Sequence, residues 1–179
     1  MVNSTGSSKK GNTHNLEVVG SKPIPGTHDL EPCVNKINNN ESIQISSMIT
    51  PEIEKLLLGK NFASFATLMD DGSPHVAPTW IDYDGHYVLI NTAAERIKEK
   101  NVRHDKRIAL SIPNESNPYE MVTIRGIVDE ITEKNADIHI DKLAKRYLGL
   151  DKYPFRSPTE KRIIIKIRPV KVFHQKPPN

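Results

Sequence analysis

The residues best suited to chemistry lie in a short polar and basic stretch, residues 91–101. Asn91 and Thr92 carry side chains that can hydrogen-bond phosphate oxygens. Residues 93–107 include six basic and three acidic residues, which gives this segment a net charge of +3. Because a helix N-terminus presents free backbone N–H groups and a partial positive charge, a polar strand end that leads into a basic helix predicts the anion anchor of a cofactor site.

The basic helix also has a plainer interpretation. Helices that mix lysine, arginine and glutamate usually just face solvent, and Glu95 and Glu99 offer partners to the basic side chains. The position of the helix, directly after Asn91 and Thr92, favours the anion anchor.

Strand-like runs surround this stretch and must position it. Residues 61–69, 75–83 and 86–90 precede it, and the alternating run 107–112 follows it. Pro78 lies in the middle of the second run, and a proline there indicates a sheet edge, a bulge or a gap, where a flat ligand can lie. Asp84-Gly85 predicts a hairpin turn into the third run.

The rest of the chain supplies two helices and two more strands. Thr50 and Pro51 begin a short helix that ends near Gly59, and residues 136–147 carry an amphipathic stripe closed by Gly149. Residues 121–131 and 162–173 form long strands, with a bend or bulge at Pro169. Six strands joined mostly by hairpins and short links predict a mainly β fold, an antiparallel barrel with peripheral helices.

Composition limits the class of protein. The chain has 179 residues, 36% hydrophobic, and a net charge of +3, which is too small to indicate nucleic-acid binding. Cys33 is the single cysteine, and the sequence contains neither an apolar run of membrane-spanning length nor a secretory signal at its start. We expect a cytoplasmic protein with a flexible tail, residues 1–47, and one folded domain, residues 48–179.

Familiar catalytic motifs are absent from the sequence. There is no nucleophile elbow, His-Glu-x-x-His motif, P-loop or Gly-x-Gly-x-x-Gly fingerprint. The seven histidines show no metal-ligand spacing, and His139 is expected on a polar helix face. We therefore expect no metal site and assign no catalytic residue.

Several ordered motifs resemble one family. The runs 65–68, 71–74 and 78–85 are similar to the split β-barrel proteins of the pyridoxamine 5'-phosphate oxidase-like superfamily, which bind flavins and deazaflavins. Residues 91–92, the basic run 96–107, residues 117–119 and residues 144–154 resemble its F420-dependent branch more closely. The resemblance spans residues 51–174 and implies a six-stranded antiparallel split β-barrel.

The resemblance also implies a homodimer with a cofactor groove at the subunit interface. The cofactor is expected to be F420, with FMN as the alternative, and the acidic tail of F420 suits further cations such as Lys100 and Arg103. The ring is expected against residues 75–79, and Tyr119 is expected to approach from the partner subunit. The implied cofactor-binding residues are His75, Pro78, Thr79, Asn91, Thr92, Arg96, Ile97 (through its backbone), Lys98, Asn101 and Tyr119.

The expected function is an F420-dependent oxidoreductase that transfers hydride between reduced F420 and a small organic acceptor. Two alternatives are an FMN-binding flavin oxidoreductase and a non-catalytic flavin- or deazaflavin-binding protein. Nucleic-acid binding through the basic helix is disfavoured, and so is pyridoxamine phosphate oxidation, because residues for the substrate phosphate are not recognisable.

Overall fold

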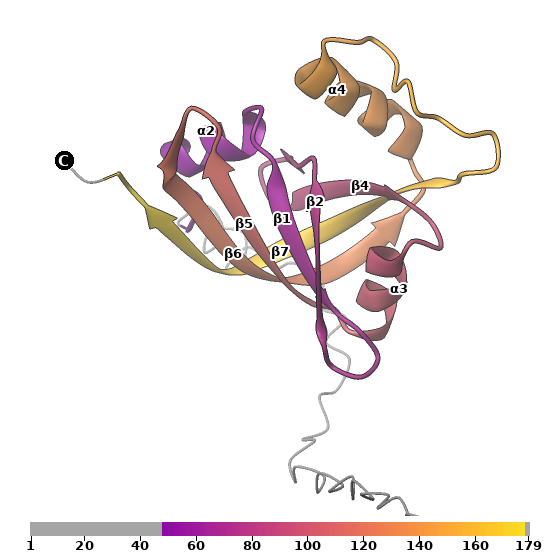
Figure 1. Ribbon diagram of the computed structural model, residues 1–179, viewed down its shortest axis with the longest axis horizontal. Helices are drawn as coiled ribbons and strands as arrows, with labels where there is room; N and C mark the ends of the chain where they lie inside the picture. Colours follow the sequence, from indigo (N-terminus) through magenta and orange to yellow (C-terminus); the bar gives the residue numbers. More distant parts are fainter. Residues whose placement is uncertain (1–47, 178–179) are drawn as a thin grey trace, which may run out of the picture. The chain divides into compact units, whose positions relative to one another are not determined.

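Seven strands form one antiparallel sheet in the order β2-β1-β5-β6-β7-β4-β3 (Figure 1). The structure is a computed structural model that describes residues 48–177. These residues belong to the second of two structural units, Val34–Asn179. The first unit, Met1–Cys33, and the predicted tail, residues 1–47, lie outside the described residues.

Most predicted elements are present, with one difference in strand number. The strands are β1 (Ala63–Leu68), β2 (Pro74–Thr79), β3 (Asp82–Tyr83), β4 (Val88–Ala93), β5 (Arg107–Asn114), β6 (Asn117–Thr132) and β7 (Arg162–Gln175). The helices are α2 (Pro51–Leu58), α3 (Ile97–His104) and α4 (Ala136–Leu148). There are seven strands rather than six because the second predicted strand is interrupted at Trp80 and Ile81, so that it forms β2 and β3.

The connection between β2 and β3 shows how the sheet closes. These two strands lie at opposite edges of the sheet, yet only Trp80 and Ile81 separate them in the chain. Because three Cα–Cα steps from Thr79 to Asp82 span at most about 11 Å, the sheet must curl until its edges approach each other. The edges are not hydrogen-bonded to each other, so the predicted split β-barrel is confirmed. Pro78 lies on the edge strand β2, where a proline is tolerated.

The inside of the curled sheet forms the main hydrophobic core. Phe65, Leu110, Ile124 and Ile165 are fully buried there, and the buried residues of β5 alternate as predicted. Helix α2 packs its apolar face, Ile53, Leu56 and Leu57, into the same core. The core therefore holds the strands whose ends build the candidate site.

Helix α4 covers the outer face of the sheet at β4 and β7. Its first residue, Ala136, packs against Leu89 and Ile164, and further along the helix Tyr147 packs against Trp80. All six residues of β4 are buried, because the core covers one face and α4 the other. Gly149 ends the helix with a positive φ of 74°, as the sequence predicts.

Helix α3 follows β4 after a short turn and begins close to the end of that strand. Glu95 in the turn has a positive φ of 66°, and its N–H donates to the buried Glu99 carboxylate at 3.1 Å. Val102 anchors the helix in the core. This arrangement brings the first turn of α3 next to Asn91 and Thr92.

Candidate functional site

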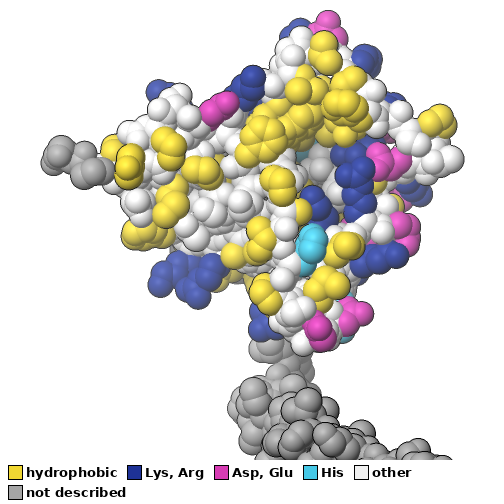
Figure 2. Space-filling model, viewed as in Figure 1, with side chains coloured by type: hydrophobic (Ala, Val, Ile, Leu, Met, Phe, Trp, Pro, Cys, Tyr) yellow, Lys and Arg dark blue, Asp and Glu magenta, His cyan; other side chains and the backbone are white. Residues whose placement is uncertain are grey.

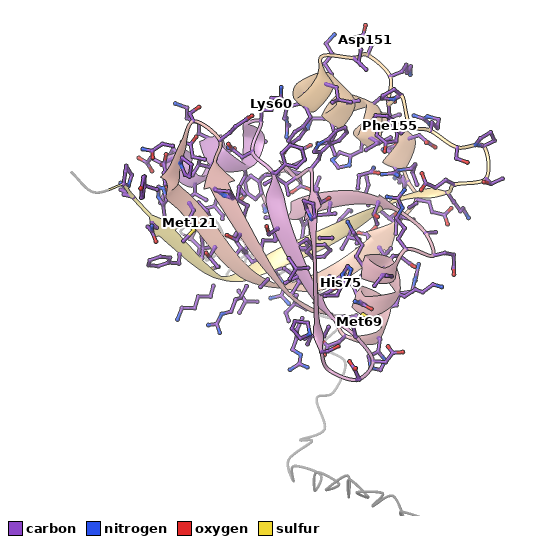
Figure 3. The ribbon with its side chains drawn as sticks, viewed as in Figure 1. Lys60, Met69, His75, Met121, Asp151 and Phe155 are labelled. Carbon is purple, nitrogen blue, oxygen red and sulfur yellow. The ribbon has the colours of Figure 1, made fainter. Side chains whose placement is uncertain are left out.

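A groove of about 230 Å³ lies beside the split in the barrel. Figure 2 shows basic side chains in a hollow below a band of hydrophobic side chains. In Figure 3, Phe155 lies next to α4, whereas His75 lies on β2, away from that helix. The residues that line the groove are Phe62, Pro78, Thr79, Trp80, Asn91, Thr92, Arg96, Lys98, Ile140, Tyr153, Phe155 and Arg162.

Within the described residues, three cations and no acidic residue line this groove: Arg96, Lys98 and Arg162. Glu160 lies behind the two arginines, pairing with Arg96 and lying 3.3 Å from Arg162 Nη1. One acid against three cations leaves the corner with a charge of +2. Such a corner attracts an anion strongly because it is partly shielded from water.

Lys98 has no hydrogen bond or ion pair with any residue in the described range 48–177. Burial lowers the pKa of its ammonium below the ordinary value, and the positive charges of Arg96 and Arg162 lower the pKa further. A half-buried lysine without a partner destabilises the folded chain in its charged form. A bound anion removes that cost, so Lys98 is better suited to a ligand than to the fold.

The Thr92 hydroxyl is a second group without a partner. Thr92 is only 2% exposed and lines the groove, and its Oγ1 has no hydrogen-bond partner among residues 48–177. Buried polar side chains are nearly always hydrogen-bonded, so an unpaired hydroxyl calls for an explanation. A ligand oxygen in the groove is a partner of the right kind, and phosphate oxygens accept hydrogen bonds from hydroxyls.

Replacing Thr92 with valine, which has a similar size, tests whether the Thr92 hydroxyl binds a ligand or stabilises the fold. We expect the free energy of unfolding to stay constant or rise by up to about 1 kcal/mol, because an unsatisfied buried hydroxyl disappears. We expect the affinity for a phosphorylated cofactor to fall roughly fivefold to tenfold, because one hydrogen bond is lost. Denaturant unfolding and fluorescence titration measure the two effects.

Thr67→Val is the matched control for that substitution. Thr67 is equally buried, but its Oγ1 accepts a 2.9 Å hydrogen bond from Asn101 Nδ2. Here valine removes the oxygen acceptor of the buried Asn101 amide and leaves only its contact with Met69 Sδ at 3.3 Å, so stability should fall by about 1–3 kcal/mol. If Thr92→Val destabilises the protein as much as Thr67→Val does, the Thr92 hydroxyl belongs to the fold.

Aromatic side chains form the wall of the groove on the side of α4. Trp80 stacks on Tyr147 with ring centres 5.0 Å apart and contacts Tyr153 edge-on at 5.9 Å. Tyr153 in turn meets Phe155 edge-on at 5.6 Å, and Phe155 is 69% exposed. The groove therefore combines a basic corner with an apolar wall that can contact a flat ring.

A buried acid holds α4 to the barrel. The Asp82 side chain is 1% exposed, and it accepts hydrogen bonds from Lys142 at 2.5 Å and Arg146 at 2.6 Å. Burial opposes ionisation of Asp82, but His139, Lys142 and Arg146 outweigh burial and hold the pKa of the carboxyl well below its usual range. The Tyr147 hydroxyl adds a 2.7 Å bond to the Asn61 carbonyl. These contacts fix the helix that carries the aromatic wall.

The structure brings six of the ten predicted residues together in the groove: Pro78, Thr79, Asn91, Thr92, Arg96 and Lys98. The other four side chains lie elsewhere. Asn101 is buried and bonded to Thr67, Ile97 is 52% exposed, and Tyr119 is 69% exposed on the β5–β6 hairpin. His75 is half-buried on β2, with its Nδ1 unpaired among the described residues. Lys100 and Arg103 pair with Glu95 and Glu99.

Several groove residues were not predicted from the sequence, and one histidine lies in a different environment from the predicted one. Arg162, Tyr153 and Phe155 come from the end of the chain, and no local pattern connects them to Asn91. The prediction that His139 lies on a polar helix face is wrong, because it is only 8% exposed and meets Asp82 and Asn91. The polar residues of β3 and β4 create a polar interior surface there, which helix periodicity alone does not show.

The family model for pyridoxamine 5'-phosphate oxidase matches residues 49–176. This span includes almost every described residue and all the residues that line the groove. The chain belongs to the pyridoxamine 5'-phosphate oxidase family. Members of this family bind flavin-type cofactors. The basic corner and aromatic wall of the groove fit a phosphorylated ring compound.

Solved structures of other proteins share the fold of this pyridoxamine 5'-phosphate oxidase family member. An F420 reductase is 29% identical, with a TM-score of 0.60 over 67% of this chain and 94% of that chain. HupZ from Group A Streptococcus is 21% identical, with a TM-score of 0.54 over 74% and 98%. General Stress Protein 26 from Bacillus anthracis is 16% identical, with a TM-score of 0.51 over 75% and 96%. The last two show likeness of fold alone.

No curated protein matches the sequence of this family member. Among residues 48–177, no helix combines the length and apolar character that a membrane-spanning segment needs.

Proposed function

We propose that this protein is an F420-dependent oxidoreductase that reduces a small organic acceptor. The observation that carries the proposal is the corner of the groove where Arg96, Lys98 and Arg162 surround the unpaired hydroxyl of Thr92. Lys98 and the Thr92 hydroxyl have no partner among residues 48–177, and the two arginines add positive charge beside them. A phosphate group is the ligand whose chemistry matches them.

The residues present fit a phosphorylated deazaflavin. Thr92, Arg96, Lys98 and Arg162 would hold the phosphate, helped by the first backbone N–H groups of α3, at Ile97 and Lys98, which have no partner within the helix. Pro78 and Trp80 line the groove beside the split in the barrel and would contact the ring.

Two observations favour F420 over FMN. The first is the 29% identity to an F420 reductase over two thirds of the chain. The second is a hollow of about 620 Å³ that shares Arg96, Tyr153 and Phe155 with the groove and continues to Lys161. FMN ends at its phosphate, whereas F420 continues beyond it as an acidic tail, and this hollow provides space for that tail.

When bound, reduced F420 would supply the hydride for an activated double bond of the acceptor, with the matching proton coming from water or from a group of the acceptor. The chain would contribute binding and orientation: the cations would hold the phosphate, and the aromatic wall would limit access of water. Among residues 48–177, no aspartate, glutamate or histidine lines the groove, so no side-chain acid is assigned to the reaction.

We also propose that the protein acts as a homodimer. Val76, Ile97, Tyr119, Val170 and Phe173 are large apolar residues that are each more than half exposed. A homodimer interface would bury these side chains, and contiguous exposed apolar surface is typical of surfaces that bind another protein. In this arrangement, Tyr119 of the partner subunit would reach the cofactor.

Binding and turnover of purified full-length protein test the proposed function. We expect F420 to bind more tightly than FMN in fluorescence titrations. We also expect oxidation of reduced F420 to be accelerated by at least one acceptor from a panel of quinones, enones and tetrapyrroles. Light scattering on the same sample should give the mass of two chains.

Each alternative function has its own signature in this experiment. FMN binding without measurable F420 affinity would leave a flavin oxidoreductase. Tight F420 binding without hydride transfer to any acceptor would leave a non-catalytic cofactor-binding protein. The mass of a single chain would refute the dimer without affecting the assignment of the cofactor.

A further inference from the structure

A line of four buried polar side chains connects the base of α4 to the groove. It runs from Asp82 on β3 through His139 on α4 and Asn91 on β4 to Arg162 on β7, and each of these residues is at most 8% exposed. Four elements therefore contribute one residue each to a path that is closed to solvent. Only Asn91 and Arg162 line the groove.

The direction of the hydrogen bonds is fixed first at Arg162. Its guanidinium can only donate, and its Nε and Nη2 lie 2.9 and 2.5 Å from Asn91 Oδ1. Asn91 therefore directs its amide nitrogen the other way, toward the Ala136 carbonyl at 2.7 Å and His139 Nδ1 at 3.3 Å. Both sites of the amide oxygen and both N–H groups are now in use.

Asn91 consequently has no capacity left for a ligand. The prediction that its side chain hydrogen-bonds a phosphate is replaced by a different role, because its oxygen holds Arg162 in place. Arg162 itself has five N–H groups, of which the bonds to Asn91 and Glu160 use three. Two N–H groups remain for a ligand in the groove.

The same argument fixes the state of His139. Since Asn91 Nδ2 can only donate, Nδ1 of His139 must accept, so the ring is neutral and carries its hydrogen on Nε2. Nε2 lies 3.3 Å from Asp82 Oδ2, within reach of a hydrogen bond although the geometry falls short of one. The charged groups around the ring are Asp82, Lys142 and Arg146 on one side and Arg162 beyond Asn91 on the other.

We propose that His139 is a positioning residue that acts through Asn91 to aim Arg162 into the groove. Together with the Ala136 carbonyl, the acceptor at Nδ1 keeps the Asn91 amide in the one orientation in which its oxygen faces Arg162. This inference rests on the proposed function only in taking Arg162 as a ligand of the cofactor phosphate. The competing explanation is that His139 simply attaches α4 to Asp82.

Two substitutions at residue 139 separate these explanations. His139→Asn keeps an acceptor oxygen at the place of Nδ1 but removes the contact with Asp82, whereas His139→Leu removes both. Positioning through Asn91 predicts that His139→Asn retains affinity for inorganic pyrophosphate and for F420, and that His139→Leu loses roughly tenfold. Attachment to Asp82 predicts that both variants behave alike. Lys142→Met, which removes another contact between α4 and Asp82, should lower the melting temperature without changing either affinity.

Nuclear magnetic resonance of the ligand-free protein tests the inference without any cofactor. We expect ring nitrogen shifts of His139 that show hydrogen on Nε2 alone. We also expect slow solvent exchange of the Arg162 Nε–H, which becomes fast in His139→Leu and stays slow in His139→Asn. A hydrogen on Nδ1, or exchange that does not differ between the two variants, would overturn the positioning role. Failure of F420 and pyrophosphate to bind the wild type would refute the proposed function. The magnetic resonance result would still show whether His139 orients Arg162 through Asn91.

Discussion

Replacing Lys98 with glutamate is expected to lower the affinity for F420 by at least about 100-fold. A hydrogen bond to a charged group contributes roughly 1.5–3 kcal/mol, and a negative charge in its place adds repulsion of similar size. Lys98 is the sharpest choice in the corner because it has no protein partner in the described range. Arg96 and Arg162 are less suitable, since changing either one also releases Glu160.

Stability provides the second readout for Lys98. Because burial and two neighbouring arginines lower the pKa of this lysine, its charge is unfavourable in the folded chain. Lys98→Met should therefore keep or raise the melting temperature while it weakens cofactor binding, as expected of a functional group that the fold tolerates at a cost. Titration calorimetry and thermal unfolding measure the two quantities.

Lys55→Glu is the control for charge. Lys55 is exposed on α2, does not line the groove, and lies on a different element from the exposed apolar residues assigned to the dimer surface. Its reversal changes the net charge of the chain as much as Lys98→Glu does, but it should leave F420 affinity within about twofold at moderate salt. Equal losses for the two variants would mean that the overall charge, and not the corner of the groove, attracts the cofactor.

The largest effect on stability is expected from Asp82→Asn. Removing one partner from a buried ion pair costs about 3–5 kcal/mol, because the remaining charges lose their counterion. Arg146, whose side chain is 17% exposed, would be left facing a neutral amide. For a domain of this size, the melting temperature should fall by roughly 10 °C or more. Calorimetry of the wild type and the variant measures the loss.

The same carboxyl predicts how stability depends on pH. The pKa of Asp82 is held below its ordinary value in the folded state, so its stabilising effect is complete above the pKa of the unfolded chain. The effect is lost as the pH falls from about 5 through the folded-state pKa. Wild-type stability should decline steeply in that range, and the decline should be shallower in Asp82→Asn.

Asp151→Asn is the matched control for Asp82→Asn. Asp151 also pairs with a lysine of α4, Lys145 at 2.5 Å, but its side chain is 81% exposed. Exposed ion pairs contribute little to stability, so no measurable change in melting temperature is expected. If Asp82→Asn were as harmless as Asp151→Asn, the cluster beneath α4 would not hold that helix to the barrel.

Much of the fold could be predicted from sequence because its signals are local. The Asp84-Gly85 hairpin forms as expected, with Gly85 at a positive φ of 95° and Asp84 Oδ1 accepting from the backbone of residues 86 and 87. Pro78 lies on an edge strand, and the pairing of β6 with β7 shifts register at Pro169. The interruption at Trp80 and Ile81 was not predicted, because their apolar side chains continue the strand pattern.

The candidate site could be predicted only in part, for a physical reason. Arg96 and Lys98 follow β4 directly in the chain, so a short sequence pattern includes them. Arg162 reaches the same corner because β7 pairs with β4, and its partner Asn91 is 71 residues away in the chain. The orientation of Asn91 is decided by Arg162 and α4 together, so the type of side chain alone suggested a contact with phosphate.

The two-residue link between β2 and β3 has a consequence for how this protein can change its ligands. Trp80 and Ile81 fix the distance between β2 and β3 across the split. The N–H and carbonyl of Ile81 are bonded to Tyr147 and Arg146 of α4. Lengthening this link would widen the groove and release the helix together. By contrast, the connection that carries Tyr153 and Phe155 joins α4 to β7 over 13 residues, 149–161, so a change in it leaves the two-residue link between β2 and β3 as it is. New acceptor preferences should therefore arise by exchanging that connection, which makes it the segment to randomise in directed evolution.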